Sequence, residues 1–385
     1  MSIQRRVKRT IHLSISFAIR LWASVALRVW GRRDRVTAGA PPQRILLINC
    51  AHIGDVVIST SLFPVLRSAY PRAEFGFLSG SWASMVVKDH PEIAFTHEID
   101  HWRLNRVSLP FRKKFLRSWT TRRKALKEIR SLNYDMSLSL HSWFPDFICL
   151  TWLAHIPRRL GFRHSWFGPF ATMLAELPQA DFVRQGARVA EILSPLGIDA
   201  RHLSKRHSML APSSDAAKQE VCDLLEIEAL GRTQYIVIHI GSGEPSRELP
   251  VEFWRQVAQE LSTNYTLLFT GRGVRDEQQI ARVISGLPHC VSACNQLSWN
   301  GFVAAVRYGK YLYGVESMAG HVAAAVGTAC SVVYTGTAGV ARWRPDGIDC
   351  TVFTQHVPCA PCGLVKGCEH MTCLRAIKPA SIIQK

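Results

Sequence analysis

The chain has 385 residues, of which 47% are hydrophobic and 20% charged, so it is long enough for two domains and its composition excludes an intrinsically disordered protein. Its formal net charge of +18 comes from residues 1–36, with nine Lys/Arg and one acid, and residues 101–130, with eleven Lys/Arg and one acid, because the remainder holds 27 basic and 27 acidic residues. Two basic segments on a neutral body, without a nucleic-acid-binding motif, favour anionic partners and exclude a protein that coats nucleic acid.

The first basic segment predicts an amphipathic helix on a membrane surface. Residues 11–30 are mostly apolar, but polar residues recur at every fourth position: His12, Ser16, Arg20, Ser24 and Arg28. Two arginines are costly at a bilayer centre, so a helix in the plane of the interface is favoured, with an N-terminal signal anchor as the alternative. Residues 1–40 are expected to be retained as this helix, because charged residues 32–35 and Pro41 disfavour cleavage at residues 38–40.

Residues 44–70 predict a buried strand, a tight turn and a helix. Residues 45–48 form the continuous apolar run of a parallel strand, and apolar residues follow at helical spacing after Asp55. Asp55 is therefore expected at the carboxyl end of a strand, where open α/β sheets bind ligands. Its carboxylate has two interpretations, a catalytic base and a group that stabilises the start of the helix.

Strands expected near residues 74–78, 94–99 and 134–140, with a helix near 82–88, continue a βαβ rhythm. Between them, the second basic segment alternates basic with aromatic residues, which is either a solvated helix face or a surface for an anionic, lipid-linked partner. Four residues of this region are candidates for binding an acceptor: Arg112, Lys113, Lys114 and His141.

The second half of the chain predicts another parallel sheet. After a polar helical stretch at 211–232, strands are expected at 235–240, 265–270 and 311–314, with a helix at 251–261 after the first. Each of these strands ends in a turn of small or polar residues, which is typical of a nucleotide-binding edge. None of the turns carries a dinucleotide fingerprint, which disfavours an NAD enzyme, and no Walker lysine motif is present.

Four motifs, in chain order, resemble glycosyltransferase family 9, the lipopolysaccharide heptosyltransferases: HIGD at 52–55, HIGSG at 239–243, ESMAGH at 316–321, and a closing cysteine cluster. The resemblance covers the chain from Arg44 to the C-terminus. It implies an α/β GT-B fold, with two Rossmann-like domains facing across a cleft. The implied domains are an acceptor domain at 41–210, a linker at 211–232, a nucleotide-sugar domain at 233–355 and a cysteine-rich tail at 356–385.

The resemblance also implies roles for individual residues. Asp55 matches the general base for the acceptor hydroxyl, and Arg247 matches a lysine that faces the donor diphosphate. The residues expected to bind the donor are Ser242, Gly243, Glu277, Glu316, Ser317 and His321. A guanidinium and the amides at a helix start stabilise a leaving nucleoside diphosphate, so neither a metal nor a further cofactor is required.

Two departures from the family pattern bear on the donor. Glu316, Ser317 and Met318 stand where the family has aspartate, serine or threonine, and glycine, and Leu249 replaces a tryptophan. A longer acid and a bulky side chain would crowd the diphosphate.

The implied activity is metal-independent, inverting transfer of heptose from ADP-heptose to a lipid-linked anionic glycan such as lipopolysaccharide core. The enzyme would lie peripherally on the cytoplasmic face of the inner membrane. The alternatives are a non-catalytic glycan-binding protein and a transferase for a different sugar nucleotide.

Four of the eleven cysteines lie in the last 27 residues: Cys359, Cys362, Cys368 and Cys373. Such a cluster could hold a structural zinc ion in tetrahedral geometry, although its short loops differ from the usual spacing of two hairpins. Reduced structural thiols and a disulfide are the alternatives.

Overall fold

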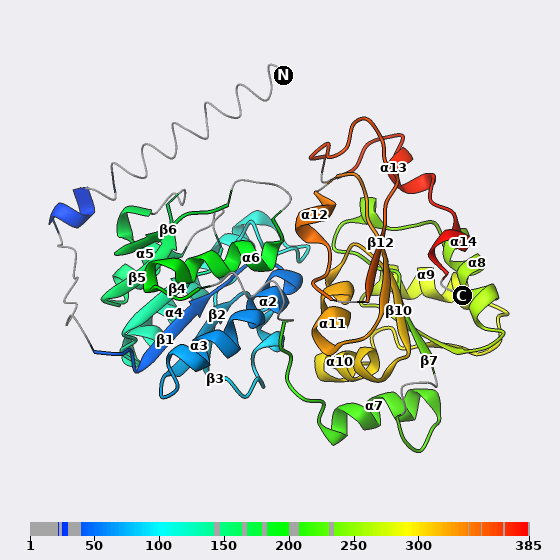
Figure 1. Ribbon diagram of the computed structural model, residues 1–385, viewed down its shortest axis with the longest axis horizontal. Helices are drawn as coiled ribbons and strands as arrows, with labels where there is room; N and C mark the ends of the chain where they lie inside the picture. The colour runs from blue at the N-terminus through cyan, green and yellow to red at the C-terminus, as the bar shows by residue number, and fades with distance from the viewer. Residues whose placement is uncertain are drawn as a thin grey trace. The chain divides into compact units, whose positions relative to one another are not determined.

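The computed structural model describes residues 22, 25–29, 40–141, 147–163, 168–178, 183–199, 208–230, 235–337, 339–347, 349–364 and 366–383. The chain forms two compact units, Met1–Gln179 with Gly186–Leu203, and Ala180–Gln185 with Ser204–Lys385 (Figure 1). Most of the helix expected at residues 1–40 lies outside the described residues. Among the residues that are described, no helix combines the length and the apolar character needed to traverse a bilayer.

The first unit is built on a parallel six-stranded sheet in the order β3-β2-β1-β4-β5-β6. Its strands are β1 (Arg44–Ile48), β2 (Glu74–Ser79), β3 (Ile93–Glu98), β4 (Met136–Ser139), β5 (Arg158–Phe162) and β6 (Met173–Ala175). β1 lies between β2 and β4 and is buried from its second residue onward, which is why its sequence is apolar without alternation. The strands expected on either side of it are confirmed.

Helices and short 3₁₀ turns connect these strands: α2 (Ile53–Ser59), η1 (Thr60–Leu62), α3 (Phe63–Ala69), η2 (Ser84–Val86), α4 (Phe111–Ser131), α5 (Ile148–Leu153), η3 (Gly168–Phe170), α6 (Gln185–Ala190) and η4 (Glu191–Leu196). The helix expected after Asp55 is present as α2, η1 and α3, which follow one another without a gap, although it begins at Ile53 and narrows to a 3₁₀ turn at η1. Pro64 has no N–H to continue the helical ladder, and the Thr60 hydroxyl donates to the carbonyl of Val57 at 2.7 Å. The helix expected at 82–88 is only the turn η2.

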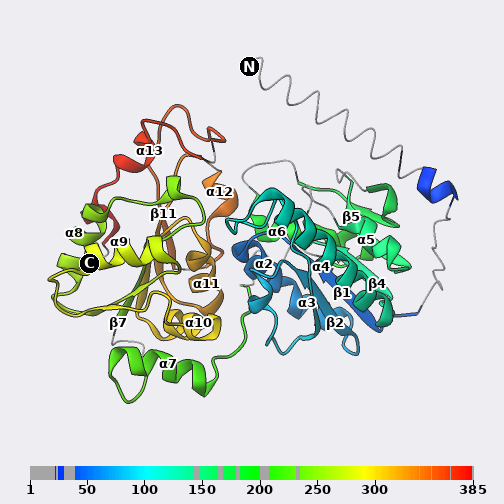
Figure 2. The same ribbon diagram turned by 180° about the vertical axis from the view of Figure 1, so that it is seen from behind.

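The second unit has a parallel sheet in the order β12-β11-β10-β7-β8-β9 (Figure 2). Its strands are β7 (Tyr235–His239), β8 (Thr266–Thr270), β9 (Cys290–Ser292), β10 (Tyr311–Val315), β11 (Cys330–Val333) and β12 (Cys350–Phe353). Its helices are α7 (Asp215–Leu225), η6 (Pro245–Arg247), α8 (Val251–Leu261), α9 (Val274–Ile284), α10 (Trp299–Tyr308), α11 (Met318–Val326), α12 (Val340–Trp343), α13 (Thr372–Arg375) and α14 (Pro379–Ile382). The three strands and the helix at 251–261 are confirmed to within a residue.

The polar stretch at 211–232 contains α7, which belongs to the second unit. Ser214 caps this helix by accepting a hydrogen bond from the amide of Ala217 at 3.2 Å. Glu220 of α7 accepts from the amide and the hydroxyl of Ser298, at 2.8 and 2.7 Å, and Ser298 is the N-cap of α10. α7 is therefore fixed to the sheet-covering helix α10 by a carboxylate at that helix's positive end.

Candidate active site

The turn between β1 and α2 holds Asp55 at the start of a helix. Asp55 is the third residue of α2, and its Oδ2 accepts a hydrogen bond from the amide of His52 at 3.2 Å. Asn49 fixes the same turn, because its Nδ2 donates to the carbonyl of Asp55 at 3.2 Å and to Ser59 Oγ at 2.8 Å. The carboxylate thus makes the capping contact expected of a helix-start residue, and it is partly exposed at the carboxyl edge of the first sheet.

His141 shares this edge with Asp55. Strands β1 and β4 are parallel neighbours with Ile48 opposite Ser139, and His141 follows β4 by two residues. The carboxyl ends of parallel neighbours lie at one edge of a sheet, so both candidates for a base belong to the same side of the first unit.

Two residues that the motifs did not single out border the Asp55 turn. Arg106 donates a hydrogen bond from Nη2 to Nε2 of His52 at 3.1 Å, and the Trp82 indole donates to the carbonyl of Ala51 at 2.8 Å. Arg106 belongs to the second basic segment, so its charge was visible in the sequence, but nothing in the spacing places it beside His52. The contact brings that segment to the turn that holds Asp55.

In the second unit, the turns after β7 and β10 bring together Ser242, Arg247 and Glu316. Arg247 Nη1 lies 3.3 Å from Glu316 Oε1, and the Ser242 hydroxyl donates to the carbonyl of Glu316 at 3.2 Å. Glu316 is only 5% exposed, and its Oε2 accepts from the hydroxyl of Thr335 at 3.1 Å. Ser242 and Glu316, two of the residues expected to bind the donor, therefore form one connected group with Arg247.

Burial has the largest effect on the ionisation of Glu316. It raises the pKa of this carboxyl, whereas the Arg247 guanidinium and the hydrogen bonds from Thr335 lower the pKa. The effect of burial is larger than the opposing effects, so the pKa of Glu316 stays above its ordinary value even with a guanidinium in contact. Glu316 is thus an acid whose charge costs free energy in the fold and is retained by its partners.

A second carboxylate, Glu248, already occupies the turn after β7. The amide of Ser242 donates to Glu248 Oε1 at 3.0 Å, and Arg275 forms an ion pair with the same carboxylate. Gln279 donates to its other oxygen at 3.3 Å, and burial raises the pKa of Glu248. Sequence reasoning missed Glu248 and Arg275, because their contact joins two turns that are 27 residues apart.

The turn after β8 places Glu277 on the surface at the start of α9. Gly273 precedes this helix with φ at 94°, in the left-handed region that favours glycine, and its amide donates to Asn295 Oδ1 at 2.7 Å. Asn295 Nδ2 in turn donates to Glu277 Oε2 at 3.3 Å. Glu277, expected to bind the donor, is therefore an exposed carboxylate in the first turn of α9.

Helix α11 begins at the turn after β10. Ser317 is its N-cap, and the side chain of Ser317 accepts from the amide of Ala319 at 3.3 Å. Burial lowers the pKa of His321, in the first turns of this helix, to about 4, so the ring is neutral at neutral pH. The start of α11 therefore offers free amides and a neutral imidazole, but its serine hydroxyl is engaged in capping.

Within the described residues, no group of three or more His, Cys, Asp and Glu side chains is placed to hold a metal ion. The four cysteines of the tail differ in environment, because Cys359 and Cys368 are exposed whereas Cys373 is buried. The zinc site stays a prediction.

Comparison with known proteins gives the same fold. The structure resembles a family 9 glycosyl transferase from Veillonella parvula DSM 2008, with a TM-score of 0.66 and 20% identity over 81% of this chain and 85% of that chain. It resembles the E. coli ADP-heptose lipopolysaccharide heptosyltransferase II, with a TM-score of 0.69 and 19% identity over 88% and 95% of the two chains. It also resembles E. coli heptosyltransferase WaaC solved with ADP, with a TM-score of 0.59 and 16% identity over 80% and 90%.

None of the curated proteins matches the chain. The family model described as glycosyltransferase family 9 (heptosyltransferase) matches residues 122–371, from within α4 to the cysteine-rich tail. This stretch is more than half of the chain, and the two parallel sheets agree with the GT-B-like fold of the solved structures. The chain therefore belongs to glycosyltransferase family 9, the heptosyltransferase family, and is a glycosyltransferase.

Proposed function

We propose that this glycosyltransferase transfers heptose from ADP-heptose to a hydroxyl of a lipid-linked anionic glycan such as lipopolysaccharide core, with inversion at the anomeric carbon. It would work peripherally on the cytoplasmic face of the inner membrane. Support for the donor comes from two solved relatives, one named an ADP-heptose heptosyltransferase and one solved with ADP-2-deoxy-2-fluoro heptose. The observation that carries the proposal is the Arg247–Glu316 pair at the carboxyl edge of the second sheet.

On the donor side, Arg247 would bind the diphosphate and stabilise the charge that ADP gathers as the bond to the anomeric carbon breaks. A preorganised guanidinium in a partly buried site is suited to this task, because it needs little reorganisation during the reaction. Glu316 holds the guanidinium through Oε1. The Glu316 carboxylate can also accept a hydrogen bond from a sugar hydroxyl. The Glu277 carboxylate would accept hydrogen bonds from the ribose hydroxyls of the donor.

On the acceptor side, Asp55 would take the proton from the acceptor hydroxyl as its oxygen attacks the anomeric carbon opposite the leaving ADP. Attack from that face inverts the configuration. The stretch matched by the family model begins at residue 122, so the role of Asp55 rests on the HIGD resemblance and on its position at the carboxyl edge of the first sheet. Its hydrogen bond from the amide of His52 would orient the carboxylate.

The contacts around Ser242 and Glu316 favour one alternative, a transferase for a different sugar nucleotide. Glu316 is one methylene longer than the aspartate of the family, and Met318 stands at the first position of α11 in place of glycine. Both changes reduce the room for the diphosphate and sugar. A glycan-binding protein without turnover is the remaining alternative.

A thermal-shift screen tests the donor. ADP and ADP-heptose should raise the unfolding midpoint, because a ligand at 100 times its Kd adds about 2.7 kcal/mol to the free energy of unfolding. A larger rise with another sugar nucleotide would assign a different donor. Release of ADP in the presence of a lipopolysaccharide-core acceptor then tests turnover, and the anomeric configuration of the product, read by NMR, tests inversion. If the donor binds but no ADP is released, the result would favour a glycan-binding protein without turnover.

A further inference from the structure

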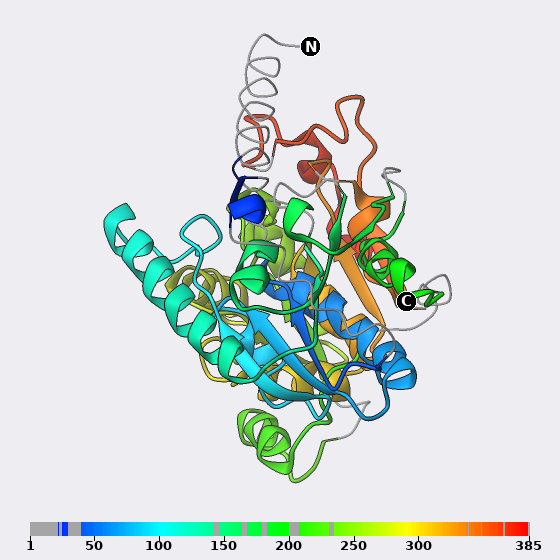
Figure 3. The same ribbon diagram turned by 90° about the vertical axis from the view of Figure 1, so that its left-hand side faces the viewer.

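The N-terminal half of α4 carries large apolar side chains that the fold does not bury. Four such side chains are between 50% and 62% exposed, Phe111, Phe115, Leu116 and Trp119, and Val107, which precedes the helix, is 52% exposed. Apolar residues four apart on a helix normally mark the side that faces a core. Here the first turns of α4 (cyan) project beyond the sheet, so this apolar side meets solvent (Figure 3). A contiguous exposed apolar patch of this kind marks an interaction surface.

This half of the helix is held firmly by the rest of the first unit. Arg117 forms an ion pair with Asp100, which is only 1% exposed, and the Asp100 amide donates to Thr121 Oγ1 at 3.1 Å. Lys114 Nζ donates to the carbonyl of Asn105 at 3.0 Å. The exposed side chains are therefore presented on a preformed helix, which lowers the entropic cost of binding.

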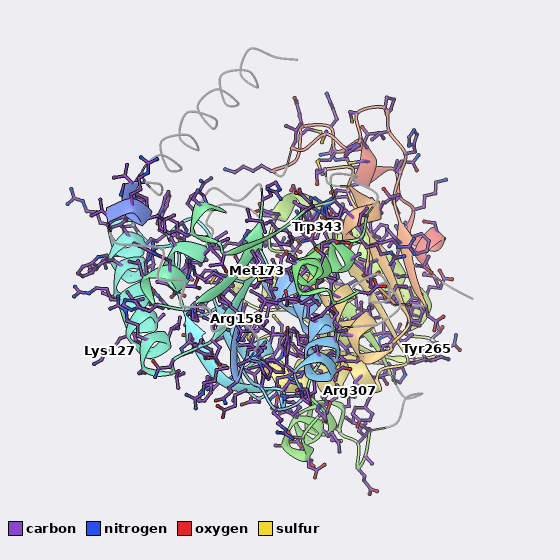
Figure 4. The ribbon with its side chains drawn as sticks, turned by 60° about the vertical axis from the view of Figure 1, so that its left-hand side comes forward. Lys127, Arg158, Met173, Tyr265, Arg307 and Trp343 are labelled. Carbon is purple, nitrogen blue, oxygen red and sulfur yellow. The ribbon has the colours of Figure 1, made fainter. Side chains whose placement is uncertain are left out.

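Basic side chains surround the apolar ones. α4 contains nine Lys/Arg and a single acid, Glu128. The Arg123 guanidinium lies over the ring of Trp119, 4.5 Å from its centroid, and Lys127 projects away from the sheet (Figure 4). Aromatic side chains flanked by Lys and Arg are typical of helices that lie in the interface of a bilayer containing anionic lipids.

The described part of the N-terminal segment adjoins the same region. Ala26 is buried against Trp152 of α5 and Phe170, whereas Trp22, Val25 and Val29 remain exposed. α4 contacts α5 as well, because Arg122 donates to Cys149 Sγ at 3.2 Å. Residues 25–29 and α4, which are far apart in the sequence, thus both adjoin α5 in the first unit.

We propose that the α4 surface, defined by Val107, Phe111, Phe115, Leu116 and Trp119 with Arg112, Lys113, Arg123 and Lys124, inserts its apolar side chains into the interface of an anionic lipid bilayer. The inference deepens the proposed function and rests on it for the acceptor, which would lie in the same membrane. Arg106 connects this surface to the acceptor side, because it lies one residue before Val107 and contacts His52 of the Asp55 turn. Binding of the membrane would bring lipid-linked hydroxyls to the edge that holds Asp55.

Vesicle co-sedimentation of the full chain tests the proposal. Vesicles of phosphatidylcholine alone are compared with vesicles that also contain phosphatidylglycerol, at low and high salt. The variant Phe111→Ser/Phe115→Ser/Trp119→Ser should reduce binding to anionic vesicles roughly 100-fold, because three partly inserted aromatic side chains are lost. Arg123→Glu/Lys124→Glu should weaken binding and its salt dependence. Val274→Ser, which removes an apolar side chain that is 67% exposed on α9, is the matched control and should bind like wild type.

Three results would overturn the proposal. If the aromatic variant binds vesicles as wild type does, membrane binding belongs to the N-terminal segment alone. Loss of binding only in the charge variant would make the surface a site for soluble polyanions. A wild-type dimer that the aromatic variant dissociates, seen by analytical ultracentrifugation, would assign the surface to a second copy of the chain.

The single variant Phe115→Ser, with an expected loss of a few-fold, keeps the test decisive if the triple variant does not fold. Vesicle binding needs neither donor nor turnover, so it fails independently of the proposed function. Conversely, the aromatic variant should retain the wild-type rate on a delipidated, water-soluble acceptor.

Discussion

Arg247 and Glu316 form an ion pair that joins the turns after β7 and β10, with Nη1 and Oε1 3.3 Å apart. The guanidinium is not fully satisfied by this pair, because its Nε is buried without a hydrogen-bond partner among the described residues. A buried N–H donor without an acceptor costs free energy, and a phosphate oxygen would remove that cost. The arrangement therefore suits a guanidinium that gains a further anionic partner when the donor binds.

Arg247→Ala should lower kcat about 100-fold, the scale of losing one preorganised electrostatic donor. Arg247→Lys retains the charge at the position where the family has lysine, and should keep much of the activity. Steady-state kinetics with the donor varied measures both. A raised KM with an unchanged kcat would instead show that Arg247 binds the ground state and the transition state equally.

Glu316→Gln should change how stability depends on pH. The pKa of Glu316 is raised in the folded state, so its contribution to the free energy of unfolding is fully present below the unfolded value and is lost as pH rises through the folded pKa. The variant lacks this loss. Its stability relative to wild type should therefore increase from acidic to neutral pH, measured by urea unfolding at several pH values. A pH-independent difference would show that Arg247 and Thr335 cancel the effect of burial.

Asp55→Asn separates catalysis from capping. Asparagine can still accept the hydrogen bond from the His52 amide, so the free energy of unfolding should change by no more than about 1 kcal/mol. Removal of the base should lower turnover by roughly 10² to 10⁴. Asp215→Asn, in the first turn of α7, is the matched control for a helix-start acid and should leave turnover unchanged. Wild-type turnover in Asp55→Asn would reduce this residue to its structural role and make His141 the next candidate for the base.

His321 predicts a loss of stability in acid. Its folded pKa of about 4 lies below the ordinary histidine value of 6.5, so stability is present above pH 6.5 and is lost as pH falls towards 4. The shift corresponds to at most roughly 3 kcal/mol. His321→Gln should therefore lose less free energy of unfolding than wild type over this range. Equal losses in the two proteins would show that His321 protonates as easily in the folded chain as in the unfolded one.

Seven of the twelve strands that the structure describes were expected from the sequence, because residues buried on both sides of a parallel sheet leave a continuous apolar run, as in β1 and β7. The other five, β5, β6, β9, β11 and β12, were not expected. The sequence also predicted the turns that hold Ser242 and Glu316, since polar turns at strand ends meet at one edge. The sequence did not predict contacts between segments that are far apart in the chain. The contact between Glu248 and Arg275, which are 27 residues apart, has no periodic signature in the sequence.

The apolar residues of α4 show a different limit of sequence reasoning. Phe111, Phe115 and Trp119 are spaced four apart, which is the spacing of a buried helix face, yet all three are exposed. Periodicity indicates which side chains share a face of a helix. It does not indicate whether that face meets a core or a partner outside the chain.

Every strand pairing in the two sheets is parallel, and this has a consequence for biosynthesis. A parallel sheet contains no hairpin that can form early, and β1 pairs with β4, which begins only at Met136. During translation, the edge of β1 that pairs with β4 therefore stays uncovered until α4 and β4 have left the ribosome. Over that interval one edge of an apolar strand is uncovered in the nascent chain, which is the kind of surface that chaperones bind.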